Sequence, residues 1–389
     1  MTNAEFIAQN KNADVRTLAL SKTKTGIDLS FCLQQIAGRQ IAEKKLPAWA
    51  ETEDILFPPK ISLEQCSSEQ TALYKQQLVE RILPMKRQKM VDLTGGFGID
   101  FTYLARLFDE ADYVERDEHL CEIAQHNFTN LGLTQAKVHH KTCEAFIDEM
   151  GNFCIIYIDP SRRDTAGRKV VALSDCSPNI ELLQDKLLEH APFVLVKLSP
   201  MLDIQDTLRR LHNVSEVHVV SVDGECKEVL LLLSREHTDA VQYTCRNIAK
   251  QMQDFSTKDI GAEPFIASSL ERYLYEPNAS ILKAGVQNAL CKSYDVKKLH
   301  PFSHLFISAH FIESFPGRCF VIDDFGSFAK KDIKRLLNGI SQCNLTIRNF
   351  PATVAELRKR LKLREGGDVY LFATTLGDGS HVLLRCSQP

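Results

Sequence analysis

A short apolar stretch that runs into a glycine-rich turn, residues 90–100, constrains the fold of this chain more than any other segment. Asp92 ends the apolar stretch, and three glycines follow it. Glycine suits a turn in which the backbone bends sharply or approaches a ligand, because it has no Cβ to collide. Residues 101–105 then show helical apolar spacing, so the segment predicts a strand, a tight turn and a helix. The glycines of the turn are Gly95, Gly96 and Gly98.

The strand expected next, residues 111–115, ends in the carboxylate of Glu115. An acidic side chain at the tip of a second strand suits the two hydroxyls of a ribose, so turn and carboxylate predict a site for a nucleoside-containing cofactor. A dinucleotide fingerprint would need a glycine where Phe101 stands, and Asp92 is a poor neighbour for a diphosphate. Asp92 suits instead the amino group and sulfonium of S-adenosylmethionine.

The order D-x-x-G-G-x-G followed by Glu115 resembles the class I S-adenosylmethionine-dependent methyltransferases. The resemblance implies that the turn holds the methionine moiety, that Glu115 holds the ribose, and that residues after the third expected strand flank the adenine. An ordinary strand–turn–helix, with glycines for geometry alone, is the alternative. The expected cofactor-binding residues are Asp92, Thr94, Gly95, Gly96, Gly98, Glu115, Thr142, Cys143 and Glu144.

Buried apolar segments alternate with helical ones from residue 79 to residue 238. Near-continuous apolar runs such as residues 155–158 are typical of a parallel sheet covered on both faces. The last two expected strands are joined through residues 223–225 and predict a terminal hairpin. A parallel body that ends in such a hairpin matches the methyltransferase fold, so we expect an α/β, Rossmann-like core.

Four regions are expected along the chain. Residues 1–78 carry helical periodicity and form a helical N-terminal region, and residues 79–238 form the S-adenosylmethionine-binding core. Residues 239–317 contain mixed short elements, including one helix over 279–290. Residues 318–389 alternate strands with helices and end in a hairpin.

Composition excludes several classes of protein. The twelve cysteines are scattered singly, without the C-x-x-C pairs typical of zinc sites. The sequence contains no apolar run long enough to span a bilayer, and its start lacks the apolar core of a signal peptide. We therefore expect a cytoplasmic protein with reduced cysteines, no membrane partner and no metal. His300, His304 and His310 are expected to be loop or surface histidines, since no carboxylate or thiol completes a metal site with them.

The net charge of -3 is unevenly distributed. From Val241 to the end, 20 basic residues stand against 14 acidic ones, a balance of +6 that leaves -9 for the first 240 residues. A basic module joined to an acidic core suggests a polyanionic partner. We expect Arg358, Lys359 and Arg360 to bind it. A solvated face of an amphipathic helix over residues 352–363 is the alternative.

The run Asp159-Pro160-Ser161-Arg162-Arg163 stands at the end of the fourth expected strand. Ligands of doubly wound sheets lie outside the carboxyl ends of the strands, so we expect this loop to face the methyl group. It is similar to the D/N-P-P-aromatic loop of many nucleic-acid methyltransferases, in which the carboxyl or amide accepts from an exocyclic amine. Ser161 and Arg162 replace the second proline and the aromatic, although an arginine plane can also stack on a base.

From this loop we expect Asp159 and Arg162 to be catalytic and Arg163 to bind base or phosphate. A turn with solvated arginines is the alternative. Methylation of uracil at C5 would need a cysteine nucleophile at the end of the fifth expected strand, residues 194–201, which holds none. Lys197 and Ser199 remain there as polar groups directed toward the pocket.

The whole chain resembles a bacterial family of methyltransferases with a THUMP-like C-terminal domain. The resemblance implies a helical N-terminal region, a Rossmann-like core, a small ferredoxin-like part over 239–317 and a THUMP-like end over 318–389. THUMP domains are associated with RNA modification, in agreement with the basic C-terminal part. The matching segments are residues 64–69 with Tyr74-Lys75, 92–98, 159–163, 273–277 and 361–364.

These features together predict an S-adenosylmethionine-dependent methyltransferase that acts on a base in RNA. The competing class is an RNA-binding protein that keeps the cofactor-binding fold and has lost methyl transfer. An NAD-dependent oxidoreductase is disfavoured by Phe101. Two interpretations stay open for residues 65–69: a lid over the cofactor, or a helix N-cap at Ser67 or Ser68.

Overall fold

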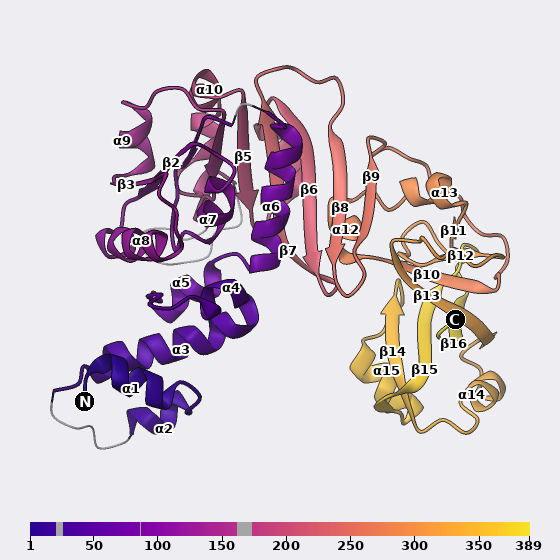
Figure 1. Cartoon of the computed structure of the whole chain (residues 1–389). Helices are drawn as coiled ribbons and strands as arrows, with labels where there is room; N and C mark the ends of the chain where they lie inside the picture. The colour runs from indigo at the N-terminus through magenta and orange to yellow at the C-terminus, as the bar shows by residue number, and fades with distance from the viewer. Residues whose placement is uncertain (21–25, 86, 162–172) are drawn as a thin grey trace. The chain divides into compact units, whose positions relative to one another are not determined.

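The structure is a computed structural model that describes residues 1–20, 26–85, 87–161 and 173–389 (Figure 1). The chain forms two compact units. Unit 1 comprises residues 1–215 together with 230–239, and unit 2 comprises residues 216–229 together with 240–389.

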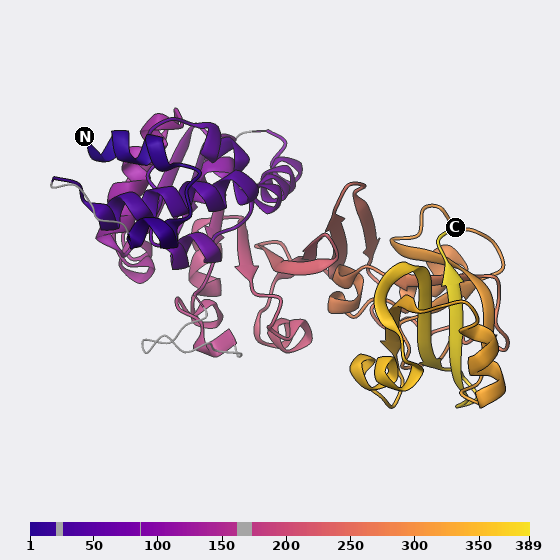
Figure 2. The same cartoon turned by 90° about the horizontal axis from the view of Figure 1, so that it is seen from below.

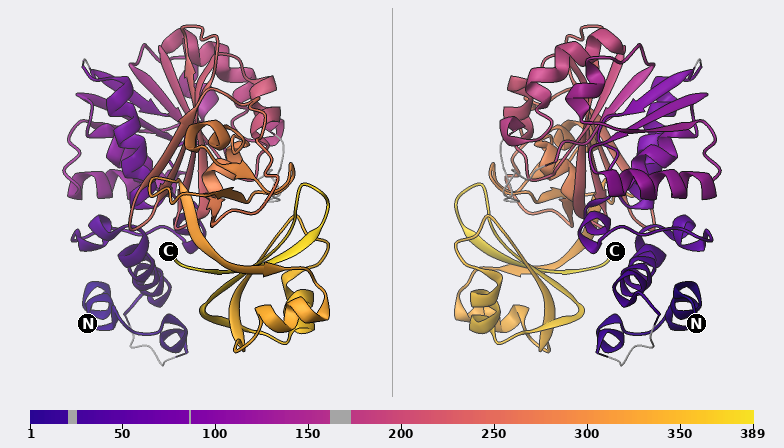
Figure 3. Two further views of the ribbon diagram at one scale, coloured as in Figure 1. Left: turned by 90° about the vertical axis from the view of Figure 1, so that its right-hand side faces the viewer. Right: turned by 90° about the vertical axis from the view of Figure 1, so that its left-hand side faces the viewer.

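Unit 1 begins with helices, as the sequence predicts. The first five gather beyond one end of the strands (Figures 1 and 3). They pack against the glycine turn, because the rings of Trp49 and Phe57 contact the ring of Phe97, at centroid separations of 4.9 and 6.3 Å. The helices are α1 (Asn3–Asn10), α2 (Val15–Ala19), α3 (Leu29–Lys45), α4 (Pro47–Glu51), α5 (Lys60–Gln65) and α6 (Glu69–Ile82).

A nine-stranded sheet has the order β3-β2-β1-β4-β5-β7-β6-β8-β9. Its first five strands pair in parallel, and all of β4 is buried, as its apolar run predicts. The strands are β1 (Lys89–Asp92), β2 (Glu110–Glu115), β3 (Ala136–His140), β4 (Ile155–Ile158), β5 (Phe193–Leu198), β6 (Val214–Val222), β7 (Glu225–Ser234), β8 (Gln242–Ile248) and β9 (Gln253–Thr257). The helices between β1 and β6 are α7 (Ile99–Ala105), α8 (Glu118–Asn130), α9 (Cys143–Ile147), α10 (Ile180–His190) and α11 (Ile204–Arg210), with a 3-10 turn at Leu173–Asp175.

The terminal hairpin is confirmed in β6 and β7, which are joined by Asp223 and Gly224 with φ of 49° and 78°. Two successive residues in the left-handed region form the turn that best matches the twist of paired strands. The large sheet continues past this hairpin, because β8 pairs in parallel with β6 and β9 pairs antiparallel with β8. Residues 242–257 therefore give β6 a hydrogen-bonded neighbour, although they lie in the stretch that the sequence assigned to a ferredoxin-like part.

Unit 2 also contains a seven-stranded sheet of order β11-β12-β10-β13-β16-β15-β14. Figure 2 shows its last strands curling beside α14 and α15. One face packs on the leucines of these two helices, and the other face has a core that includes Phe320 and Phe372. The elements are β10 (Tyr273–Pro277), α12 (Ala279–Ala284), α13 (Ala289–Tyr294), β11 (Lys297–Lys298), β12 (Phe306–Ser308), β13 (Gly317–Gly326), α14 (Lys330–Leu336), β14 (Gln342–Arg348), α15 (Val354–Leu361), β15 (Arg364–Thr375) and β16 (His381–Ser387).

The single helix expected over residues 279–290 is wrong, because two short helices occupy this region. Gly285 ends α12 with a φ of 75°, the left-handed conformation that glycine adopts at helix C-termini. The α/β fold and the final hairpin of β15 and β16 are confirmed.

Candidate active site at the carboxyl edge of the sheet

The carboxyl ends of β1, β2, β4 and β5 meet at one edge of the sheet, because these strands are parallel neighbours. They carry Asp92, Glu115, Asp159 and Lys197 in that order. Open α/β sheets bind their ligands outside this edge. The structure therefore brings the predicted cofactor residues and the predicted catalytic aspartate to one place.

Gly95 and Gly96 shape the turn for different reasons. A Cβ on Gly95 would lie 2.2 Å from Cε2 of Tyr113, whose buried ring donates a hydrogen bond through its hydroxyl to the carbonyl of Gly96. Gly96 has a φ of 57°, while a Cβ there would meet only the carbonyl oxygen of Thr94, at 3.7 Å. From the sequence, the glycines were explained by a sharp turn or by the close approach of a ligand. For Gly95 the structure shows another reason for the absence of a side chain: the turn packs directly against Tyr113 of β2.

Glu115 ties the tip of β2 to this turn. Its Oε2 accepts from the backbone N–H of Gly96 at 2.8 Å, and its Oε1 accepts from the N–H of Asp117 at 2.9 Å. Each carboxylate oxygen has a second lone pair, so both can still accept from a hydroxyl. The half-buried Glu115 is thus held in a fixed orientation that suits a vicinal diol.

Thr94 links the ends of β1 and β4. Its hydroxyl donates to Oδ1 of Asp92 at 3.3 Å and accepts from the backbone N–H of Asp159 at 2.7 Å. Burial raises the pKa of Asp92 well above its usual range, and the nearby carboxylates of Asp100 and Asp159 raise it further. A cation beside Asp92 would favour its ionised form, so the residues present fit the positively charged part of S-adenosylmethionine.

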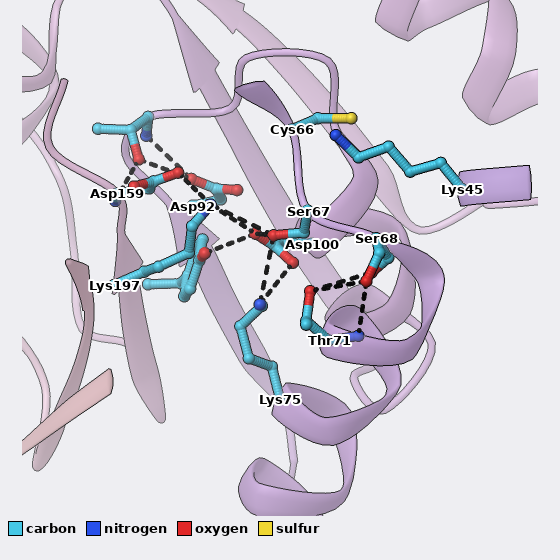
Figure 4. Close-up of polar contacts among 12 residues, drawn as sticks. Lys45, Cys66, Ser67, Ser68, Thr71, Lys75, Asp92, Asp100, Asp159 and Lys197 are labelled. Carbon is cyan, nitrogen blue, oxygen red and sulfur yellow. Dashed lines mark hydrogen bonds and ion pairs between the residues drawn. The ribbon is translucent and has the colours of Figure 1, made fainter. Parts of the chain in front are cut away.

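A buried ionic network lies beside Asp159 (Figure 4). The ammonium of Lys197 pairs with Asp159 and lies 3.4 Å from Oδ2 of Asp100. Lys75 is fully buried, and its Nζ forms an ion pair with Oδ1 of Asp100 at 3.2 Å. The hydroxyls of Ser67 and Tyr157 both donate to Oδ2 of Asp100, each at 2.7 Å.

The charges of this network are matched. Burial by itself would raise the pKa of Asp100, but Lys75 and Lys197, helped by the two hydroxyls, hold it well below its usual range. Asp100 is therefore an anion between two cations, and Lys197 connects it to the carboxylate of Asp159. Through Lys197, the side chain of Asp159 is thus linked to a network built from four separate parts of the chain.

Sequence analysis did not assign Asp100 or Tyr157 to the site, and named Lys197 only as a polar group near it. A usable signal exists for the first two, because Asp100 is the one charged residue of α7 and Tyr157 is the one residue of β4 with a polar group on its side chain. Lys75 was matched only as part of a family segment, and Ser67 was considered as a helix N-cap or as part of a lid. The N-cap interpretation of residues 65–69 is confirmed at Ser68, whose hydroxyl accepts from the N–H of Thr71. The lid stays a prediction.

The residues expected to flank the adenine follow β3, the neighbour of β2. The hydroxyl of Thr142 accepts from the N–H of Ala145 at 3.2 Å and so caps α9. Cys143 is buried and Glu144 is exposed. Of the predicted acceptor-side residues, Arg162 and Arg163 lie outside the described residues.

The basic residues expected to bind the partner lie on α15 of unit 2. Lys359 and Arg360 are exposed, whereas the Arg358 side chain is only 19% exposed and reaches the Cys343 carbonyl and Glu365. Leu357 and Leu361 are buried, as the helical pattern predicts. The same pattern places Val354 on the inward face, but this residue is 40% exposed at the first turn of the helix.

The described residues, 1–20, 26–85, 87–161 and 173–389, contain no group of three or more histidine, cysteine, aspartate or glutamate side chains that could hold a metal ion. Within the same residues, no helix has both the length and the apolar character that crossing a membrane requires. All twelve cysteines are free, and most of them are buried.

Comparison with known proteins identifies the family. A THUMP domain-like family model matches residues 317–388, and a ferredoxin-like domain model matches residues 273–316. A protein of known crystal structure, described as a putative methyltransferase from Porphyromonas gingivalis W83, has 32% sequence identity to this chain. The two structures superpose with a TM-score of 0.88. The alignment covers 99% of this chain and 97% of that chain. The chain belongs to this methyltransferase family.

Membership confirms the predicted family and its ferredoxin-like and THUMP-like C-terminal parts. Two further solved structures are much less similar. A protein described as a putative class I S-adenosylmethionine-dependent methyltransferase from Listeria monocytogenes is 11% identical over 49% of this chain and 68% of that chain, with a TM-score of 0.38. A protein described as a putative RNA methyltransferase from Pyrococcus horikoshii is 14% identical over 49% of this chain and 97% of that chain, with a TM-score of 0.36. No curated protein matches the sequence.

Proposed function

We propose that this protein transfers the methyl group of S-adenosylmethionine to a base in RNA. The observation that carries the proposal is the group of Asp92, Glu115 and Asp159 at the carboxyl edge of the sheet, with Glu115 bonded to the glycine turn. Membership of the methyltransferase family supports the reaction. The THUMP domain-like match and the basic α15 support RNA as the acceptor.

Asp92, Glu115 and Asp159 would have different roles, according to their charge and position. When bound, S-adenosylmethionine supplies a methyl group on a positively charged sulfur, which leaves as a neutral thioether. Asp92 would balance the positive charge, and Glu115 would accept from the ribose hydroxyls. Asp159, held by Lys197, would accept a hydrogen bond from the attacking amino group of the base and direct its lone pair at the methyl carbon. The nitrogen would gain the methyl group and lose a proton, either to the Asp159 carboxylate or to water. The in-line orientation would supply most of the acceleration.

Replacing Glu115 by alanine should weaken the binding of S-adenosylmethionine by about tenfold or more, because each hydrogen bond to a charged acceptor contributes about 1.5–3 kcal/mol. Titration calorimetry measures the change. Glu115→Gln keeps one accepting oxygen, so its affinity for S-adenosylmethionine should lie between those of the parent and Glu115→Ala. Glu110→Ala, at the exposed start of the same strand, is the matched control and should bind like the parent. Tight binding of NAD with none of S-adenosylmethionine would contradict the proposed cofactor.

Reversing the two exposed charges on α15, in a Lys359→Glu, Arg360→Glu variant, should weaken RNA binding for every sequence tested and leave the affinity for S-adenosylmethionine unchanged. Bound phosphates release counterions, so the logarithmic salt dependence should become shallower by about 0.7 for each phosphate that the variant no longer neutralises. Arg358 is left in place because its guanidinium also contacts the protein.

Fluorescence anisotropy with total RNA at several salt concentrations checks this expectation. Lys44→Glu with Lys60→Glu makes the same change of charge at exposed positions of unit 1 and serves as the control. Equal loss in both variants would show a general charge effect, and no loss in either would mean that α15 presents only a solvated face.

A further inference from the structure

An exposed phenylalanine in unit 2 stands on a rigid loop. Phe302 is 78% exposed, yet the residues around it are held firmly. The ammonium of Lys298, almost completely buried, donates to the carbonyl of Pro301 at 2.7 Å and to Oδ1 of Asn288 at 3.0 Å. The backbone N–H of Ser303 donates to the carbonyl of His300 at 3.0 Å. Since burying an ammonium is costly, this loop is built to keep its shape.

A continuous series of contacts connects Phe302 to the basic helix α15. The rings of Phe302 and His300 lie 5.6 Å apart, and Nδ1 of His300 is 3.0 Å from the Asn349 side-chain amide. The next residue, Phe350, contacts the ring of Phe328 at 4.8 Å. The guanidinium of Arg360 lies 5.8 Å from the centre of that ring. We call His300, Phe302, Asn349, Phe350, Phe328 and Arg360 the aromatic track.

The backbone at Asn349, which links His300 to Phe350, is held in place by contacts of its own. Asn349 has a φ of 51°, a left-handed conformation that asparagine tolerates, and its carbonyl accepts from the hydroxyl of Thr375 at 2.6 Å. The preceding residue, Arg348, pairs with the buried carboxylate of Glu276. Both loops that carry the aromatic track are thus attached to the sheet of unit 2, so Phe302 and Arg360 keep a defined relation to each other.

We propose that the aromatic track binds single-stranded RNA, with an unpaired base stacked on Phe302 beside His300 and the adjoining backbone on Arg360. This inference rests on the proposed function, because it takes RNA as the partner and names its form. Single-stranded nucleic acids are held by aromatic faces together with positive charge, and the track supplies both. Inside a base-paired duplex both faces of each base are covered by its neighbours, so stacking on Phe302 favours single strands over duplexes.

Fluorescence anisotropy on the full chain tests the proposal, with a labelled single-stranded RNA of about 12 nucleotides and the duplex of the same sequence as probes. Phe302→Ala should weaken single-strand binding by about 5- to 150-fold, the range that base–aromatic stacking supplies. Duplex binding and the slope of affinity against salt should stay as in the parent, because the variant keeps every basic side chain. Phe325→Ala, at another exposed phenylalanine of unit 2, is the matched control and should have no effect.

A conservative variant adds a direct readout of stacking. Phe302→Trp should restore single-strand binding, and its fluorescence should be quenched by the RNA, while Trp49 contributes a constant background because it is buried. Unchanged single-strand binding in Phe302→Ala, while the Lys359→Glu, Arg360→Glu variant loses RNA, would overturn the stacking and leave the proposed function intact. A parent protein that binds neither these probes nor total RNA would overturn RNA as the partner.

Discussion

Replacing Lys75 by methionine is expected to lower the free energy of unfolding by about 3–5 kcal/mol, the loss typical of removing one partner from a buried ion pair. Lys75 is fully buried, and Asp100 beside it is almost so. Without this ammonium, the carboxylate of Asp100 keeps Lys197, but Lys197 also serves Asp159. Denaturant unfolding of the parent and the variant measures the difference.

The pH dependence of this loss follows from Asp100. Because the two lysines lower its pKa in the folded protein, its contribution to stability is complete above about pH 4, the usual pKa of an aspartate, and is lost as the pH falls below it. The difference between the parent and Lys75→Met should therefore be constant near neutrality and shrink only in acid. Lys186→Met removes an exposed ion pair with Asp148 and should cost less than about 1 kcal/mol. Equal stability of the Lys75 and Lys186 variants would show that the network does not support the fold.

Replacing Asp159 by alanine is expected to lower methyl transfer by about 10²- to 10⁴-fold, the range of a positioned group that takes part in proton transfer. Binding of S-adenosylmethionine should change little, because the proposed contact of Asp159 is to the acceptor. The measurement is incorporation of labelled methyl into total RNA from cells that lack the gene, with calorimetry for the cofactor. Asp148→Ala, at an exposed aspartate, is the control and should transfer like the parent.

An asparagine at position 159 separates two roles of this side chain. An amide oxygen can accept a hydrogen bond but cannot take a proton, so Asp159→Asn should keep much of the activity if orientation is the main role. Activity as low as that of Asp159→Ala would assign proton transfer to the carboxylate. Parental activity in Asp159→Ala would remove Asp159 from the mechanism. If the parent binds the cofactor and no RNA fraction ever accepts label, the RNA-binding alternative without methyl transfer is favoured.

The network of Lys75, Asp100 and Lys197 gives a physical reason for the family segment around Ser67. Its hydroxyl donates to Asp100, and the ammonium groups of Lys75 and Lys197 lie 3.3 and 3.2 Å from its oxygen. The start of α6 is thereby attached to the residues that hold Asp159. A buried set of paired charges is weak evidence for stability alone, because apolar packing could do as well. Its contact with the predicted catalytic residue through Lys197 instead favours a role in orienting that residue.

The sequence by itself determined the features that depend on short spacing along the chain. The glycine turn between β1 and α7, the apolar β4 and the helix α15 all have local causes: backbone freedom, apolar runs and the 3.6-residue period. The α/β fold and the family followed from them and are confirmed. The roles of Asp92, Glu115 and Asp159 stay predictions, although the structure brings these residues to one edge of the sheet.

Only the tertiary structure decided which distant segments meet. Ser67, Asp100 and Lys197 are separated by as many as 130 residues, and no local period of the sequence encodes their contacts. The same holds for β8, which joins β6, and for Asn349, which meets His300 across 49 residues. Local spacing predicts what each segment becomes, whereas the pairing of strand edges and of buried charges arises from the whole chain, because each such group needs a partner once water is excluded.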